Sequence, residues 1–192
     1  MKKLHVLSFV VICTLLLTGS AMADSIQGKI GVTGKIGFLI PSDGDFDTRR
    51  NGTDTGFVGG GGVIYGFDKN IAGEIDITRT EFGSDNGDFG TTNISLGAQY
   101  RFLLSETKVV PYVGGGLDLL MNDSDRRYDV DTTLGIHLSG GVDFFVTKQI
   151  ALTAEAKLVL APDADISEPS GKRGNFDPSS FSTLFGVRYF FN

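Results

Sequence analysis

His137 and Ser139 are separated by one residue and carry the side chains of an acyl-transfer site. An imidazole and a hydroxyl on one strand face can perform acyl transfer when a carboxylate orients the histidine. Alternation along the strand turns both side chains toward the small and polar face of the segment. We therefore expect His137 to be part of a polar network close to Glu155 or Asp143, and we predict no catalytic residue.

The segment Asp43-Gly-Asp45-Phe-Asp47 has the alternating carboxylates with which a calcium-binding loop begins. Its sixth position is Thr48 rather than glycine, and its twelfth is Asp54, which is shorter than the bidentate glutamate of an EF-hand. The sequence thus excludes a true EF-hand, while weak divalent-cation binding by clustered loop carboxylates stays open as an alternative. No cofactor and no other metal site is predicted.

A limited set of charged residues lies among small residues on one face of the predicted strands. Four side chains are positive and five are carboxylates, so their charges nearly cancel. A buried charge is tolerated only when it is paired. We predict that these side chains and one histidine form a salt-bridged, partly hydrated interior network; the alternative is that several are solvated near the rims. The set consists of Lys35, Glu74, Asp76, Arg101, Asp118, His137, Asp143, Glu155, Lys157 and Arg188.

Eight segments have apolar residues at every second position and are predicted to be strands. They are Lys29–Ile40, Gly56–Phe67, Ile71–Thr80, Thr92–Phe102, Val109–Met121, Thr132–Val146, Ile150–Leu160 and Ser180–Phe191. Most are long enough for a tilted strand to cross a bilayer. Long connections, which hold most of the acidic residues, alternate with shorter ones; the long ones are Pro41–Thr55, Glu81–Thr91, Asn122–Asp131 and Ala161–Ser179. We predict an all-β fold, an eight-stranded antiparallel up-and-down transmembrane β-barrel whose long connections face outward.

The composition of the second strand face distinguishes a membrane barrel from a soluble one. A soluble barrel carries apolar residues inside and long charged side chains outside. Here the second face is mostly glycine, serine and threonine, which fit the narrow lumen of eight strands. In Val109–Met121 we place Val113 and Leu117 outward and Asp118 and Tyr112 inward, because a carboxylate in lipid costs a few kcal/mol.

The N-terminus has the features of a secretory signal peptide. Two lysines precede a largely apolar run over 4–17, and Ala21-Met22-Ala23 has the small-x-small form that signal peptidase requires. The apolar run is too short to be a membrane-spanning helix. We predict a signal peptide over 1–23 and one barrel domain over 24–192.

The composition of the predicted mature chain excludes several classes of partner and site. Cys13 lies in the segment to be removed, so the mature chain has neither a disulfide nor a thiolate metal site. Without Lys2 and Lys3, 15 basic residues stand against 23 acidic ones, a net charge of −8. Nucleic acid is excluded as a partner, because phosphate binding requires a basic surface.

The last segment alternates in the way that a terminal barrel strand requires. Phe181, Phe185, Val187, Tyr189 and Phe191 share one face. An apolar face that ends in aromatic residues suits contact with lipid and with the membrane interface.

This ending (185–191, FGVRYFF), the eight strands, the signal peptide and the segment 111–117 (PYVGGGL) together resemble the outer-membrane β-barrel family. That family includes OmpA transmembrane domains, OmpX-like proteins and opacity-type proteins. The resemblance implies the bacterial outer membrane as location, recognition of the C-terminal strand by the barrel-assembly machinery, and contact with outer-membrane lipid and lipopolysaccharide. The start (29–38, KIGVTGKIGF, then Pro41) is also similar to OmpW proteins, which are associated with passage of small hydrophobic compounds.

We therefore predict a monomeric outer-membrane barrel with a structural or surface-interaction role through four acidic extracellular loops, without catalysis. An OmpW-like narrow channel for small hydrophobic solutes is one alternative, and it requires an apolar cavity near the outer rim. A lipid A-modifying hydrolase, like the eight-stranded deacylases, is another, and it requires His137 on the lipid side. A soluble periplasmic barrel is the third, and it requires an apolar interior.

Overall fold

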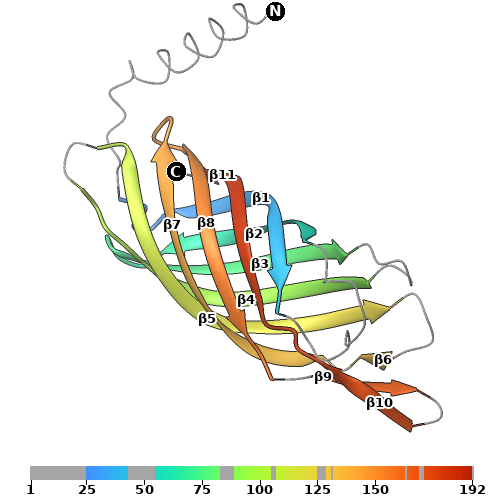
Figure 1. Cartoon of the computed structure of the whole chain (residues 1–192). Coiled ribbons are helices and arrows are strands. Elements are labelled where there is room, and N and C mark those ends of the chain that lie inside the picture. The colour runs from blue at the N-terminus through green and yellow to red at the C-terminus, as the bar shows by residue number, and fades with distance from the viewer. Residues whose placement is uncertain are drawn as a thin grey trace, which may run out of the picture.

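Eight strands close into an antiparallel barrel, which confirms the predicted fold class. A computed structural model of the chain describes residues 25–42, 55–82, 89–104, 107–124, 129–130, 132–162, 164–168 and 171–191. The barrel order is β1-β11-β8-β7-β5-β4-β3-β2, and it closes because β1 pairs with both β2 and β11 (Figure 1). The strands are β1 (Ile30–Pro41), β2 (Gly56–Gly66), β3 (Ile71–Phe82), β4 (Phe89–Arg101), β5 (Val109–Ser124), β7 (Thr133–Phe145), β8 (Ile150–Leu160) and β11 (Ser180–Phe190).

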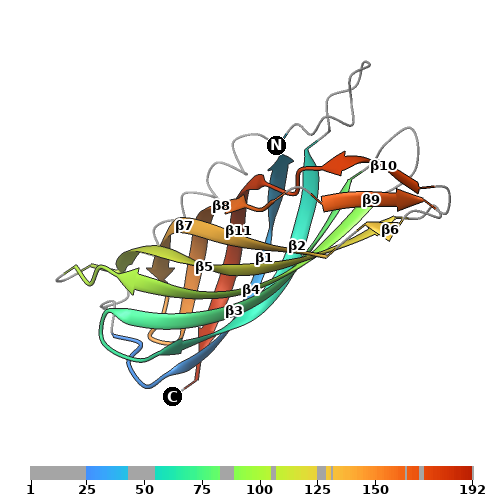
Figure 2. The same cartoon turned by 90° about the horizontal axis from the view of Figure 1, so that it is seen from below.

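Three further strands lie in two of the long connections, where the sequence predicts no strand. β6 (Asp129–Val130) pairs with β9 (Ala164–Glu168), and β9 pairs with β10 (Gly171–Phe176). This three-stranded sheet extends from the end of the barrel opposite the C-terminal end of β11 (Figures 1 and 2). Apolar periodicity does not find these strands, because they are short and mostly polar and their pairing rests on backbone hydrogen bonds.

The outer surface of the barrel wall is apolar. Ile36, Leu117 and Leu138 are 59%, 58% and 64% exposed, although each lies within a strand. The alternate positions face the lumen, and Asp118 is buried there, which confirms the orientation predicted for β5. An apolar exterior around a charged interior is the arrangement of a membrane barrel, and it excludes the soluble alternative.

Three aromatic pairs lie on the outer face near the end that carries the short turns. The rings of Tyr65 and Phe67, of Tyr100 and Phe102, and of Tyr189 and Phe191 each meet edge to face at 5.1 Å. Their position near one end of the wall suits the boundary between hydrocarbon and water, where aromatic residues gather. No helix in the described ranges is long and apolar enough to cross a membrane.

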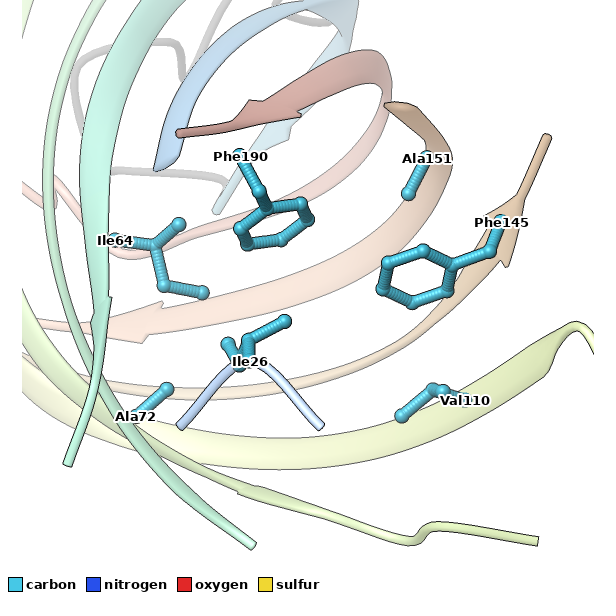
Figure 3. Packing of buried hydrophobic residues seen from close by; sticks show 7 residues of the cluster. All are labelled: Ile26, Ile64, Ala72, Val110, Phe145, Ala151 and Phe190. Carbon is cyan, nitrogen blue, oxygen red and sulfur yellow. The ribbon is translucent and has the colours of Figure 1, made fainter. Parts of the chain in front are cut away.

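Ile26, which precedes β1, lies inside the barrel at this same end. Its side chain is 2% exposed. Seven buried side chains point toward one another across the lumen and are called here the apolar base: Ile26, Ile64, Ala72, Val110, Phe145, Ala151 and Phe190 (Figure 3). The Gly28 amide donates to the Gly66 carbonyl at 2.7 Å, and a φ of 73° at Gly28 lets the chain turn there. The segment before β1 thus closes one end of the lumen.

Candidate functional site

The ten side chains of the predicted polar network lie in the lumen between the apolar base and the outer end. Each of them is at most 9% exposed. They project from every barrel strand except β2, where Gly60 and Gly62 take inward positions. The Oδ1 atom of Asp76 occupies the space that a Cβ atom at Gly62 would need. The charged side chains are therefore inside the barrel rather than at its rims, and glycines make room for them.

Two arginines and two carboxylates form an inner group next to the apolar base: Arg101, Arg188, Glu74 and Asp143. Arg188 Nη2 lies 3.0 and 3.1 Å from the two carboxylate oxygens of Glu74, and Arg188 Nη1 lies 3.1 Å from Asp143 Oδ2. Arg101 Nη2 donates to the same Asp143 oxygen at 2.7 Å. The ring of Tyr112 lies 5.2 and 5.8 Å from the guanidinium carbons of Arg188 and Arg101. The charges of the inner group cancel.

Two lysines and three carboxylates form an outer group, nearer the long connections: Lys35, Lys157, Asp76, Asp118 and Glu155. Lys35 Nζ lies 2.8 Å from Asp76 Oδ2 and 3.5 Å from Glu155 Oε1, and it also reaches the glutamate of the inner group at 2.9 Å. Lys157 Nζ lies 2.8 Å from Asp118 Oδ1. The outer group has one carboxylate more than it has lysines.

His137 joins the outer group through Asp118. Its Nδ1 atom lies 2.5 Å from Asp118 Oδ2, whereas the position predicted from the sequence is close to Glu155 or Asp143. The imidazole turns toward β5 because Gly116, the residue opposite His137 on that strand, leaves space for the ring. Within the described ranges His137 and Ser139 form no hydrogen bond with each other, and both side chains face the lumen. This geometry does not offer a Ser–His pair to the lipid phase.

Two small voids lie among the charged side chains. One, called here the mouth pocket, measures about 40 Å³ and opens toward the outer end; the other measures about 20 Å³ and lies deeper. Asp76, Glu155 and Lys157 line both voids. Voids of this size and polarity hold a few water molecules. The outer part of the network is therefore spacious enough to be hydrated.

Aliphatic side chains line the wall of the mouth pocket. Leu39, Val58, Leu120, Val159 and Leu184 project into it from five strands. From the sequence, the inner face is predicted to be mostly glycine, serine and threonine with a limited set of charged residues, and none of these five aliphatic residues is predicted to line the lumen. Strand alternation could have predicted this aliphatic wall, because all five residues occupy inward register positions in the outer halves of their strands. The lumen is apolar at its base, charged in its middle and mixed at its mouth.

Five buried polar atoms have no hydrogen-bond partner among the described residues. They are Thr33 Oγ1, Asp76 Oδ1, Asn93 Oδ1, Asp143 Oδ1 and Arg188 Nε. Asp76 and Asn93 both line the mouth pocket, and both unpartnered atoms are acceptors. Leaving a buried acceptor unpaired costs about 1–3 kcal/mol. The outer side of the network therefore has a shortage of donors.

Asp177 and Ser179 attach the last long connection to the rim of the mouth pocket. The Ser179 amide donates to Asp177 Oδ1 at 2.9 Å, and the Ser42 amide donates to the Ser179 carbonyl at 2.8 Å. Partial burial acts to raise the pKa of Asp177, but hydrogen bonds from Ser179 and from the Ser42 side chain outweigh it and hold that pKa below its usual value. Pro178 is buried at this rim.

Most acidic residues of the outer connections lie outside the described residues. These include Asp43-Gly-Asp45-Phe-Asp47 and Asp54, so the hypothesis of weak divalent-cation binding concerns a part of the chain that the structure does not describe. The predicted signal peptide over 1–23 lies there too. Among the residues that are described, no group of three or more His, Cys, Asp and Glu side chains is placed to hold a metal ion.

Comparison with known proteins gives one family match and several similar folds. The model of a family described as outer membrane protein beta-barrel domain matches residues 9–191. The structure of Neisserial surface protein A is 21% identical with a TM-score of 0.68, over 84% of this chain and 97% of that chain. OprG from Pseudomonas aeruginosa is 15% identical with a TM-score of 0.69, over 89% and 99%. Outer membrane protein W of E. coli is 17% identical with a TM-score of 0.52, over 86% and 98%. No curated protein matches the chain in sequence.

Proposed function

Because the chain belongs to the outer-membrane β-barrel family, we propose that it is a closed, non-catalytic barrel with a structural or surface-interaction role. The protein resides in the bacterial outer membrane, and the apolar exterior of its barrel contacts lipid acyl chains there. In such barrels the short turns face the periplasm and the longer loops face outward. The outer connections are then the part of the chain that meets the surroundings of the cell.

The filled lumen is the observation that supports this proposal. The apolar base closes the end with the short turns, where Phe145 and Phe190 stack at 5.8 Å. The inner group lies next to this base, and Arg188 and Asp143 within it are completely buried. Side chains fill the interior of an eight-stranded barrel, so it has no aqueous channel like that of the larger porins. A closed barrel can have a structural role in the membrane, or it can interact with other molecules through its surface.

The absence of catalysis is supported by the position of His137. A lipid A-modifying hydrolase needs its histidine and serine at the lipid side, whereas His137 pairs with Asp118 inside the barrel. Asp118 is also held by Lys157 at 2.8 Å, so the carboxylate acts as the centre of an ion-pair network. The arrangement favours a structural role for these side chains.

The proposed partners follow from the surfaces of the barrel. Outer-membrane lipid and lipopolysaccharide would surround the apolar wall and the acidic outer rim, and the C-terminal strand β11 would be recognised by the barrel-assembly machinery. We expect a monomer, because the wall is apolar in the way that lipid contact requires. One similar barrel is named a surface protein, Neisserial surface protein A, and another is named the attachment invasion locus protein of Yersinia pestis. Those names favour a surface role for this chain as well.

A narrow channel for small hydrophobic solutes is a second candidate, and the aliphatic wall of the mouth pocket favours it. Leu39, Leu120 and Val159 form the kind of opening near the outer rim that such a channel requires. The pocket measures only about 40 Å³, however, and the charged groups and the apolar base lie below it. We therefore rank the closed barrel first.

Conductance and solute uptake by the refolded mature protein distinguish the two candidates. In planar bilayers we expect no channel events, and in liposomes we expect no uptake of small apolar solutes above that of empty vesicles. A double variant, Phe145→Ala with Phe190→Ala, thins the apolar base and serves as the comparison in which leakage is expected. Heat-dependent gel mobility verifies that both proteins are folded. Stable channel events in the wild-type protein would refute the closed barrel, and solute uptake would establish the second candidate.

A further inference from the structure

The two ends of the barrel differ in charge. The four long connections hold 15 carboxylates against six cations. At the end with the short turns, the charged side chains that the structure describes outside the lumen are four lysines and one carboxylate: Lys29, Lys69, Lys108, Lys148 and Asp68. The sequence adds Asp24 and Glu106 there, in parts of the chain that the structure does not describe, so lysines stay in the majority. The rim with the short turns is therefore the basic end of an acidic protein.

Two of these lysines occupy the same place in two similar turns. In the turns over 67–71 and 146–150, the first two amides donate to the carbonyl of the last residue at 2.9 and 3.1 Å. Lys69 and Lys148 take the third position of these turns, and both side chains are exposed. The carboxylate of Asp68 accepts from the Lys69 amide and is thus directed toward its own turn. Defined backbone hydrogen bonds therefore hold both lysines at fixed places on the rim.

Both exposed lysines lie beside outward-facing aromatic pairs. Lys69 follows the pair of Tyr65 and Phe67 by two residues. Lys148 lies next to the C-terminal end of β11, which carries the third pair, because the Gln149 carbonyl accepts from the Phe190 amide at 2.7 Å (Figure 1). Aromatic residues mark the level where hydrocarbon meets the lipid headgroups. A lysine at this level lays its stem along the apolar surface and holds its ammonium among the headgroup phosphates.

The four lysines are distributed around the barrel. One stands in each of four segments at this end: before β1, between β2 and β3, between β4 and β5, and between β7 and β8. In the barrel order these segments lie on different sides of the wall. A ring of cations fits a partner that surrounds the wall, as lipid does, whereas a globular protein would dock on one side.

We propose that this rim selects anionic phospholipids, of the phosphatidylglycerol class, in the periplasmic leaflet of the outer membrane. Lys69 and Lys148 donate to the headgroup phosphates, and the aromatic pairs beside them pack against the upper parts of the acyl chains. Phosphatidylcholine carries its own cation next to its phosphate, so it gains less from a lysine. The inference goes beyond the proposed function, because it adds one class of lipid at one leaflet. It rests on the membrane location and not on whether the barrel conducts solutes.

Spin-labelled lipids test this selection. The full mature protein is refolded in phosphatidylcholine vesicles that contain a trace of phosphatidylglycerol or phosphatidylcholine with a label on the acyl chain, and the EPR spectrum separates lipid at the barrel from bulk lipid. One lysine near the surface favours an anionic lipid about fivefold, so we expect an average preference for phosphatidylglycerol of about twofold or more. Salt at about 1 M should abolish the preference by screening. Equal association of the two labels at low salt would overturn the proposal, and so would a preference that survives high salt.

Variants at the two ends of the barrel locate the preference. The double variant Lys69→Gln with Lys148→Gln should lose about half of the preference for phosphatidylglycerol or more. Lys172→Gln with Arg173→Gln removes the same charge from the last outer connection, and it should keep the wild-type preference. Heat-dependent gel mobility verifies folding, and each single lysine variant should show a smaller loss if the double variant does not fold.

Two results with folded variants would overturn the proposal: an unaltered preference in the lysine variant, or an equal loss in the control. Channel events in the wild-type protein would refute the closed barrel but would leave this preference unchanged, so the two proposals fail separately.

Discussion

Arg188 and Glu74 are 114 residues apart in the chain, and the Nη2 atom of the arginine lies 3.0 and 3.1 Å from the two carboxylate oxygens of the glutamate. The two residues belong to β11 and β3, which are separated by β1 and β2 in the barrel order. The ion pair therefore crosses the lumen and connects parts of the wall that share no backbone hydrogen bond. Such a contact stabilises the closed barrel against opening between its strands.

Arg188→Ala should lower the free energy of unfolding by about 3–5 kcal/mol, because it leaves Glu74 and Asp143 buried with fewer cations. Urea unfolding of the protein in lipid vesicles measures this change. Arg79→Ala is the matched control, since Arg79 pairs with Glu81 at 3.5 Å and both side chains are exposed. An exposed pair contributes at most about 1 kcal/mol. Equal losses for the two variants would contradict the cross-lumen role of Arg188.

The inward position of the charged residues could be predicted, but their pairing could not. Alternation along each strand places Asp118, His137 and Arg188 on the lumen side, and the structure has them there. The partner of each side chain depends on the register between neighbouring strands and on the tilt of the wall, neither of which a single sequence specifies. His137 therefore pairs with Asp118 on β5 instead of with Glu155 or Asp143.

The closure of the barrel by Ile26 could not be predicted from periodicity. Ile26 stands outside the first strand, between the predicted cleavage site and Ile30, and a lone apolar residue has no period. Two other residues of the apolar base are weakly indicated by the sequence. Phe145 and Phe190 are large apolar residues at inward positions, and both lie at the end of the barrel that carries the short turns.

Ile26→Ala should lower the free energy of unfolding by roughly 2–4 kcal/mol, because it leaves a void in a base that is otherwise completely buried. Gln27→Ala changes the next residue, whose side chain is exposed, and should change that free energy by less than about 0.5 kcal/mol. Urea unfolding in vesicles gives both values. If Ile26→Ala has no larger effect than Gln27→Ala, the segment before β1 does not form part of the packed base.

Gly116→Ala should destabilise the barrel by about 1–3 kcal/mol through overpacking. A Cβ atom at this position would lie 2.8 Å from Cε1 of His137 and would also meet the backbone of Leu96. Gly34→Ala is the control, because nothing lies within 4 Å of a Cβ atom there. The control should be neutral or slightly stabilising, since alanine restricts the unfolded chain more than glycine does. The thermal unfolding midpoints of the two variants measure this difference in stability. Equal midpoints would show that Gly116 does not pack closely against His137.

Leu138→Arg should cost about 2–4 kcal/mol of stability, because Leu138 is 64% exposed near the middle of β7 and an arginine there would face hydrocarbon. Leu134→Arg places the same charge near the outer end of β7, where the cost falls to about 0–1 kcal/mol. Unfolding in vesicles, with refolded yield as a second readout, compares the two positions. A cost that does not depend on depth would mean that lipid does not cover this wall.

The contact between Asp177 and Ser179 should depend on pH in a defined direction. The pKa of Asp177 lies below its ordinary value of 3.8, because hydrogen bonds from Ser179 and Ser42 favour the charged form. The stabilisation is therefore present above that ordinary value and is lost as the pH falls through the lower pKa of the folded protein. The amide shift of Ser179, whose N–H donates to Asp177 Oδ1 at 2.9 Å, should titrate with a midpoint below 3.8. In Asp177→Asn the same signal should stay constant over this range, since an amide oxygen accepts the bond without titrating. A midpoint at or above 3.8 in the wild-type protein would show that these hydrogen bonds do not hold the outer connection to the rim.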